Sequence, residues 1–321
     1  MNELSRRIRS GARRRIKRII LAEGEDPRII EAAKTVVYEC IARPVLLGRE
    51  RIIARLARSA GLDRDTVTVV DPSCDGRLSF YAEILREIRG IPLEEARESV
   101  KDNMSFGMLM LRCGAADGMV CGACEPCADV IGRGSELLGA KNGVCATFLL
   151  NMRDGRIFSF SDCALANRPT AEQVCDAAEL GARDHEQLTG EGARIAFLSY
   201  STYGREATEA VERMRRAMAL TGERYPRLFI GGELRLDAAM DEHVANFRIG
   251  ADRACSANVL VFPDANSAIV SRRIVQRLTR ARVLGPVLRG FSKPVNDLRD
   301  RCTAEEIADM VAVTAVQAEG I

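Results

Sequence analysis

Tryptophan is absent from this chain, and aromatic residues make up only 5% of it. Proteins that bind single-stranded nucleic acid stack the bases on aromatic rings, so this composition argues against that function. No stretch approaches the roughly 18 consecutive apolar residues of a membrane-spanning helix. Histidine occurs only as His185 and His243. Both lie among charged neighbours in expected helices, and we interpret both as surface residues.

Several nucleotide-binding and hydrolytic motifs are also missing. The chain contains no G-x-x-x-x-G-K-[ST] phosphate loop and no G-x-S-x-G turn of a serine hydrolase. The sequence Gly132-Arg133-Gly134 begins a G-x-G-x-x-G pattern but lacks its third glycine. These absences disfavour a dinucleotide site and exclude the common serine-hydrolase arrangement.

Charge is nearly balanced, with a formal net charge of +2. One basic segment, from Arg6 to Arg18, is an exception and is typical of either a nucleic-acid arm or a helix surface. Ile8, Ala12 and Ile16 recur within it at helical spacing. We therefore predict a solvated first helix that leads into a strand. The segment also lacks the apolar core of a secretory signal.

The 11 cysteines are an odd number and are spread through the chain, which predicts free thiols in a reducing cytoplasm rather than a disulfide framework. Cys121, Cys124 and Cys127 form a C-x-x-C-x-x-C pattern that is compatible with metal or redox chemistry. Three thiols do not complete a tetrahedral site, and Cys113 or Cys145 would have to approach as a fourth ligand. We favour ordinary packing for these cysteines and predict no metal.

The length of 321 residues suggests two domains, and strand-like runs alternate with amphipathic helices along the chain. Such alternation predicts an α/β fold with mainly parallel sheets flanked by helices, and ligands at the carboxyl ends of the strands. Met152–Gly155 reads as a hairpin turn and predicts one antiparallel pair. The expected strands are Arg18–Ala22, Pro44–Gly48, Val67–Val70, Gly118–Cys121, Val144–Leu150, Ile157–Ser161, Arg194–Leu198, Leu228–Gly232 and Asn258–Phe262. The helices between and after them include 27–40, Thr170–Leu188, Glu206–Leu220 and Ser267–Leu278.

A set of short segments, in the same order along nearly the whole chain, resembles the phosphotransacetylase (phosphate acetyltransferase) family. Each segment is weak alone, and the ordered set is specific. They are Leu21–Arg28 (LAEGEDPR), Asp117–Val120 (DGMV), Leu198–Thr202 (LSYST), Gly232–Leu234 (GEL), Asn258–Asp264 (NVLVFPD), Lys293–Leu298 (KPVNDL) and Thr314–Ala318 (TAVQA).

The resemblance implies a two-lobed α/β fold that is similar to those of isocitrate and isopropylmalate dehydrogenases. A first lobe of residues 1–143 would be completed by the C-terminal helix at 297–321, and residues 144–296 would form the second lobe. The implied reaction is reversible transfer of an acetyl group between coenzyme A and inorganic phosphate. Coenzyme A would be a substrate, with no other cofactor, and the protein would be a cytoplasmic homodimer.

The family mechanism implies a carboxylate that deprotonates the coenzyme A thiol and arginines that hold phosphate. A thiol with a pKa near about 8.5 needs such a base, and the planar guanidinium suits phosphate. Glu306 stands at the position of the family's aspartate base, although Thr303–Glu306 also reads as a helix capping box. Arg86 stands at the position of a phosphate-binding arginine, although a solvated helix charge explains it equally well.

The resemblance breaks down at other cleft positions. The family's serine and arginine after Asn-Asp-Leu, and the glycine that follows, are here Arg299, Asp300 and Arg301. Asp300 reverses the sign of the charge, and Arg299 or Arg301 would have to supply the missing guanidinium. Arg133 is displaced by one position from the family's second phosphate arginine, which is about 100° on a helix.

The remaining cleft candidates for substrate and coenzyme A are Ser199, Lys293, Asn296 and Asp297, although Asn296 and Asp297 equally suit a turn. The altered cleft leaves alternatives open. They are phosphate acyltransfer of propanoyl or butanoyl groups, a catalytically impaired paralogue that binds coenzyme A or a partner, and a thiol- or metal-dependent function at the cysteines.

Overall fold

The computed structural model describes residues 2–162, 166, 168–241, 243–244, 256–299 and 301–320. The chain divides into two compact units. The first combines Met1–Lys141 with Gly290–Ile321, and the second consists of Asn142–Arg289. Each unit contains a sheet covered by helices, as the alternation of apolar patterns predicts.

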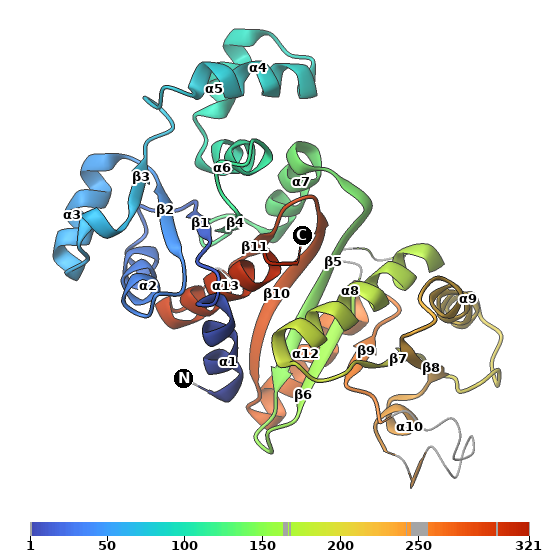
Figure 1. Cartoon of the computed structure of the whole chain (residues 1–321). Helices are drawn as coiled ribbons and strands as arrows, with labels where there is room; N and C mark the ends of the chain where they lie inside the picture. Colours follow the sequence, from blue (N-terminus) through green and yellow to red (C-terminus); the bar gives the residue numbers. More distant parts are fainter. Residues whose placement is uncertain are drawn as a thin grey trace. The chain divides into compact units, whose positions relative to one another are not determined.

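The first unit is built on a five-stranded parallel sheet with the order β11-β4-β1-β2-β3 (Figure 1). Helices α6 and α13 both pack on β4, which buries this strand along its whole length. The four strands expected in this part of the chain are present, whereas the short strand β11 was interpreted as a turn or cleft segment. The elements are α1 (Glu3–Ala12), β1 (Arg18–Leu21), α2 (Pro27–Tyr38), β2 (Arg43–Leu47), α3 (Glu50–Ala60), the 3₁₀ turn η1 (Arg64–Thr66), β3 (Thr68–Val70), α4 (Leu78–Arg89), α5 (Leu93–Val100), α6 (Asn103–Arg112), β4 (Gly118–Cys121), α7 (Cys127–Leu138), β11 (Val295–Asp297) and α13 (Ala304–Gln317).

Helix α2 begins as its sequence predicts. The Asp26 side chain accepts a hydrogen bond from the backbone N–H of Arg28 at 2.8 Å, and Pro27 occupies the first helical position. The helix ends at Tyr38, slightly before the expected end at Cys40, because Cys40 has a positive φ of 54° that a right-handed helix does not allow.

Helices α1 and α13, from opposite ends of the chain, pack together in this unit (Figure 1). Arg9 is 3% exposed, and its Nε donates to Oδ1 of Asp309 at 2.7 Å while its Nη1 donates to Oε1 of Glu39 at 2.9 Å. The prediction of a solvated first helix is therefore wrong for this face of α1. The arginine is buried against a carboxylate 300 residues away in the sequence, and local periodicity does not reveal such a distant partner.

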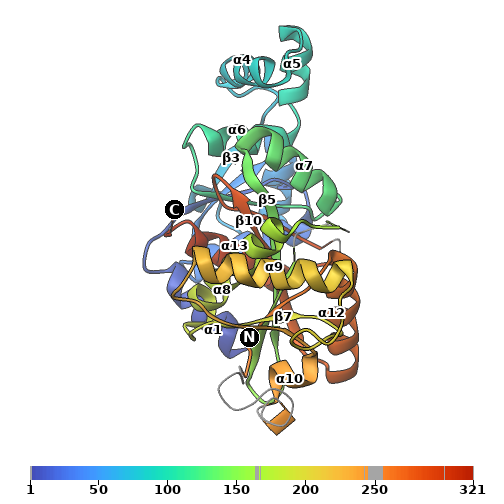
Figure 2. The ribbon, with the colours of Figure 1, turned by 90° about the vertical axis from the view of Figure 1, so that its right-hand side faces the viewer.

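Helices α4 and α5 pack against each other in the first unit and lie apart from its sheet in both views (Figures 1 and 2). Gly90, with a positive φ of 66°, ends α4 and reverses the chain into α5. This pair carries Arg86, one of the two predicted phosphate arginines.

The second unit is built on a six-stranded sheet with the order β10-β5-β6-β9-β7-β8. The predicted hairpin is confirmed, since β5 and β6 are antiparallel, while β6–β9, β9–β7 and β7–β8 are parallel pairs. Helix α9 begins three residues later than the expected Glu206, after Thr208. The elements are β5 (Ala140–Asn151), β6 (Ile157–Asp162), α8 (Ala171–Thr189), β7 (Arg194–Leu198), α9 (Glu209–Arg224), β8 (Phe229–Leu234), α10 (Leu236–Met240), β9 (Val259–Val261), α12 (Ala265–Thr279) and β10 (Arg282–Phe291).

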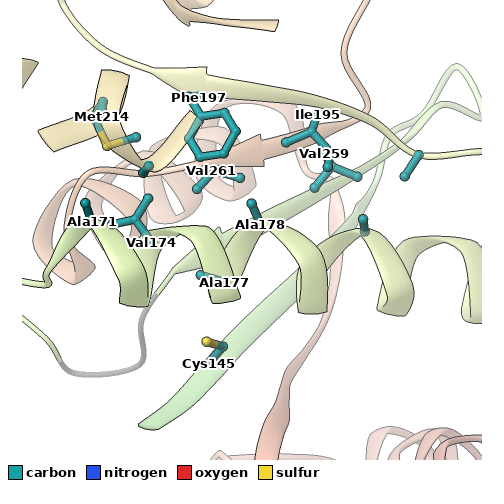
Figure 3. Packing of buried hydrophobic residues seen from close by; sticks show 13 residues of the cluster. Cys145, Ala171, Val174, Ala177, Ala178, Ile195, Phe197, Met214, Val259 and Val261 are labelled. Atoms are coloured by element: carbon teal, nitrogen blue, oxygen red, sulfur yellow. The ribbon is translucent and has the colours of Figure 1, made fainter. Parts of the chain in front are cut away.

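The core of the second unit lies between α8 and the sheet (Figure 3). Val174 and Ala178 of α8 face Phe197 of β7 and Val261 of β9, and Met214 of α9 closes one end. Small alanine side chains on α8 allow the helix to approach the strands closely, so that branched side chains fill the remaining volume.

His185 lies in α8 and is fully buried, so its interpretation as a surface residue is wrong. Its Nδ1 is 2.9 Å from the Ser159 hydroxyl of β6. Burial, together with the positive charge of Arg194, lowers the pKa of His185 to about 4, so the ring is neutral at physiological pH. His243 is exposed.

Candidate active site

The carboxyl ends of three neighbouring strands meet at one edge of the first unit's sheet. Strands β11, β4 and β1 are adjacent and parallel, and they are followed or ended by Asp297, Gly122 and Glu23 respectively. In open parallel sheets this edge is where ligands bind. Two carboxyl groups and several thiols therefore meet where a functional site is expected.

Glu23 is tied to the segment that follows β4. Its Oε1 accepts hydrogen bonds from the backbone N–H groups of Gly122 at 2.7 Å and Ala123 at 3.1 Å. Its Oε2 is buried and has no hydrogen-bond partner among the described residues. Burial raises the pKa of the Glu23 carboxyl to about 7, despite the backbone N–H groups, which lower it.

Asp297 also contacts Gly122. It is 4% exposed, and a Cβ placed on Gly122 would lie 2.1 Å from Asp297 Oδ1, so only glycine fits there. Gly122 also has a positive φ of 91°. Burial and, to a smaller extent, the negative charge of Glu23 raise the pKa of Asp297 to about 7, and a hydrogen bond with the Cys127 side chain opposes this rise.

The clustered cysteines lie at this edge, where Cys121 and Cys124 are protonated thiols. Burial first, and then the nearby Glu23 and Asp297 carboxyl groups, raise the pKa of Cys121. Burial and the charges of Glu23 and Asp26 likewise raise the pKa of Cys124. Raised thiol pKa values disfavour the thiolate that redox or metal chemistry requires. In the described part of the chain, no three His, Cys, Asp or Glu side chains are arranged to hold a metal ion.

Arg28 provides a guanidinium at the same edge. Its Nη2 donates to the Ala123 carbonyl at 3.2 Å, its Nη1 donates to the Cys302 carbonyl at 3.3 Å, and its Nη2 also pairs with Asp26 at 2.6 Å. Arg28 therefore links the segment after β4 to the segment that leads into α13.

The two predicted phosphate arginines lie on different helices of the first unit. Arg86 on α4 is exposed, and its Nε pairs with Glu83 of the same helix at 2.8 Å. Arg133 on α7 forms an ion pair with Asp102, which also caps α6. Both guanidinium groups thus have carboxylate partners within the protein.

Helix α7 owes its position partly to Gly134. A Cβ at this residue would lie 2.7 Å from the ring of Phe291, which is closer than real side chains approach. The helix axis therefore lies against the aromatic ring, and the neighbouring Arg133 is placed by this contact.

Glu306 occupies the predicted capping box of α13. Its Oε2 accepts from the backbone N–H of Thr303 at 2.9 Å, and Thr303 Oγ1 accepts from the Glu306 N–H at 3.2 Å. Its Oε1 pairs with Arg299 Nη2 at 2.6 Å. Arg301 is exposed, and Asp300 lies outside the described residues. The structure thus brings Glu306 and Arg299 into contact.

The other predicted cleft residues differ in their surroundings. Asn296 is fully buried, and its Nδ2 donates to Thr314 Oγ1 at 2.8 Å and to Gln317 Oε1 at 2.6 Å, which ties β11 to α13. Lys293 is half-buried in the turn before β11. Ser199, in the second unit, accepts a hydrogen bond through Oγ from the Ser201 N–H at 3.1 Å.

Comparison with known proteins gives this geometry its context. Residues 3–315 match the family described as phosphate acetyl/butaryl transferase. The chain belongs to this family. A phosphate acetyltransferase of Acetivibrio thermocellus is 37% identical over 316 residues, which cover 95% of each protein.

Solved structures of phosphotransacetylases resemble nearly the whole chain. A phosphotransacetylase from Streptococcus pyogenes matches with a TM-score of 0.95 at 30% identity over 100% of both chains. The EutD phosphotransacetylase from Staphylococcus aureus matches with a TM-score of 0.90 at 28% identity over 98% of both chains. The resemblance seen in the sequence, the α/β fold and the acyltransferase class are confirmed.

Glu23 and Arg28 were not predicted from the sequence as candidate functional residues of this phosphate acetyl/butaryl transferase. Both lie in Leu21–Arg28, which served only to recognise the family. A local signal was present, since a carboxylate directly after a buried parallel strand points to the ligand-binding edge.

Among the described helices, none is long and apolar enough to cross a membrane.

Proposed function

We infer that this chain is a phosphate acetyltransferase, which transfers an acetyl group reversibly between coenzyme A and inorganic phosphate. The observation that carries this inference is the match to proteins of that name at 37% identity over nearly the whole length of both chains. Coenzyme A and phosphate are then the substrates, and we propose that the protein acts as a cytoplasmic homodimer.

The residue roles are proposed from the family pattern. Arg86 and Arg133 bind the phosphoryl group, for which a guanidinium offers paired hydrogen bonds. Glu306 accepts the thiol proton, and Arg299 and Arg301 offset the negative charge that develops during transfer. Ser199, Lys293 and Asp297 belong to the substrate and coenzyme A part of the site, whereas Asn296, the fourth residue of this set, supports it by holding β11 against α13.

The reaction follows from these roles in the direction of acetyl-CoA formation. The thiol proton moves to the Glu306 carboxylate, and the resulting thiolate attacks the carbonyl carbon of acetyl phosphate. The carbon–oxygen bond to the phosphate then breaks, and phosphate leaves with its charge held by arginine. Glu306 returns its proton to the departing phosphate or to water. Before Glu306 can accept the thiol proton in the first step, Arg299 has to release its Oε1.

The direct test is an assay of the purified protein with acetyl phosphate and coenzyme A, following thioester formation by ultraviolet absorbance. We expect turnover, and we expect Glu306→Gln to lower kcat by about 100-fold or more, because general base catalysis contributes roughly that factor. Glu305→Gln is the matched control, since Glu305 is an exposed neighbour on the same helix. Equal activity of both variants would refute the role of Glu306.

One observation favours a second candidate, a catalytically impaired paralogue. Glu306 and Arg299 already neutralise each other, and Arg86 and Arg133 are likewise paired with carboxylates. For this candidate we expect coenzyme A binding by calorimetry without turnover of acetyl, propanoyl or butanoyl phosphate. Faster turnover of the propanoyl or butanoyl substrates would instead assign the longer acyl group.

A further inference from the structure

The loop between β4 and α7, residues Gly122 to Pro126, is held at both ends by buried carboxyl groups. Glu23 Oε1 accepts from the backbone N–H groups of Gly122 and Ala123 at the start of the loop. Asp297 packs on Gly122 and hydrogen-bonds to Cys127, the first residue of α7. Together the two side chains fix where α7 begins.

The two carboxyl groups both contact one glycine. Glu23 contacts the N–H of Gly122, and Asp297 Oδ1 lies beside the Gly122 Cα, where no side chain fits. Oε2 of Glu23 and Oδ1 of Asp297 are buried and have no hydrogen-bond partner in the described parts of the chain. Two such groups close together cannot both ionise cheaply, because neither water nor a cation offsets their repulsion.

The other charged and titratable groups nearby do not cancel this repulsion. Cys121 and Cys127 present thiols to the pair, and Cys124 presents another beside Glu23. Arg28 is paired with Asp26, and Arg133 is paired with Asp102. A proton is therefore the available means of neutralising one of the two carboxyl groups.

We propose that Glu23 and Asp297, which both contact Gly122, carry one proton between the two of them and, as positioning residues, hold the β4–α7 loop so that Arg133 is placed to bind phosphate. Arg133 lies on α7 less than two turns after Cys127, so a shift of the helix start moves its guanidinium. This inference rests on the proposed function only in assigning Arg133 to phosphate.

The proposal has a defined consequence at alkaline pH. Loss of the shared proton leaves two adjacent carboxylates, which repel each other and loosen the loop. We therefore expect weaker binding of acetyl phosphate as pH rises, by about tenfold between pH about 7 and about 9, since each pH unit past a coupled pKa weakens binding up to tenfold. Acetyl-transfer chemistry after binding should be much less affected, so KM rises more than kcat falls.

The test compares acetyl phosphate binding by calorimetry, without coenzyme A, in wild type and Asp297→Asn from about pH 6 to about pH 9. The amide keeps the shape of the side chain and cannot become a second carboxylate, so the alkaline weakening should disappear. Glu25→Gln is the matched control, because Glu25 is two residues from Glu23 but pairs with Arg49 at 2.7 Å. It should retain the wild-type pH dependence. Identical alkaline weakening in wild type and Asp297→Asn would overturn the proposal.

An infrared measurement tests the shared proton independently of activity. Wild type should show the carbonyl stretch of a protonated carboxyl group that disappears with rising pH through neutrality. Glu23→Gln and Asp297→Asn should each leave a single band that disappears at lower pH than in wild type, because the remaining carboxyl group stays buried but ionises without a charged neighbour. Absence of the band in wild type at about pH 6 would also refute the proposal. A titrating band in a protein without turnover would count against the proposed function alone.

Discussion

At the scale of single residues, His185 shows how burial sets a charge state. The side chain is enclosed between α8 and β6 and contacts only a neutral hydroxyl through Nδ1. Its pKa of about 4 lies below the ordinary histidine value of 6.5, so on acidification the unfolded chain binds a proton before the folded protein does. Stability from this residue is therefore complete above pH 6.5 and is lost as pH falls toward 4.

We predict that acidification from about pH 7 to about pH 5 lowers the free energy of unfolding by about 2 kcal/mol through His185. The variant His185→Asn should be less stable than wild type at neutral pH, because it leaves a cavity, but should lose most of this acid dependence. Denaturant unfolding at several pH values measures both effects. His243→Asn, at an exposed position, serves as control and should follow wild type throughout.

The pKa values of Glu23 and Asp297 are raised, whereas that of His185 is lowered, for the same physical reason. Burial disfavours the charged form in each case, which makes a histidine a weaker base and a carboxyl group a weaker acid. Sequence alone did not identify either effect, because burial depends on which strand ends and helices meet in space.

At the scale of single elements, α7 illustrates how one glycine positions a helix. Gly134 faces Phe291, whereas Gly132, two residues earlier on the same helix, has no atom within 4 Å of where its Cβ would lie. The two positions share helical conformation and differ only in what surrounds them. The same substitution at these two positions therefore distinguishes the effect of packing on stability from the effect of helix propensity.

We predict that Gly134→Ala destabilises the protein by about 1–3 kcal/mol, because the added methyl group overlaps the Phe291 ring and the helix must move. Acetyl phosphate binding should weaken as well, since Arg133 moves with the helix. Gly132→Ala should instead stabilise by about 0.5–1 kcal/mol through better helix propensity. Thermal unfolding and calorimetry give both quantities, and equal effects of the two substitutions would contradict this account.

At the scale of the whole molecule, the two units should respond to pH in opposite directions. In the first unit, the pKa of Glu23 rises from 4.5 in the unfolded chain to about 7. The stability it contributes is complete below pH 4.5 and is lost as pH rises through 7. In the second unit, His185 causes loss of stability on acidification.

We predict that hydrogen exchange, followed by mass spectrometry, will accelerate at acidic pH mainly in segments of the second unit, after correction for the intrinsic pH dependence of exchange. At alkaline pH it should accelerate mainly around β1, β4 and β11 of the first unit. The variants His185→Asn and Glu23→Gln should each suppress the response of their own unit only. A uniform change across both units would contradict the prediction.

The order of strands and helices followed from local information. Period-two and helical apolar patterns, the Asp26-Pro27 helix start, the Met152–Gly155 hairpin and the Thr303–Glu306 capping box each depend on neighbours a few residues apart. The ordered family motifs also sufficed to identify the acyltransferase class.

The tertiary structure alone decided which distant groups touch. Glu23 meets Gly122 across 99 residues, Arg9 meets Asp309 across 300, and His185 meets Ser159 across 26. No periodic pattern encodes these pairs, because each depends on how strand ends and helix faces are brought together by packing. The sequence by itself determined most of the elements and the family, whereas folding determined which side chains are buried and which charges they carry.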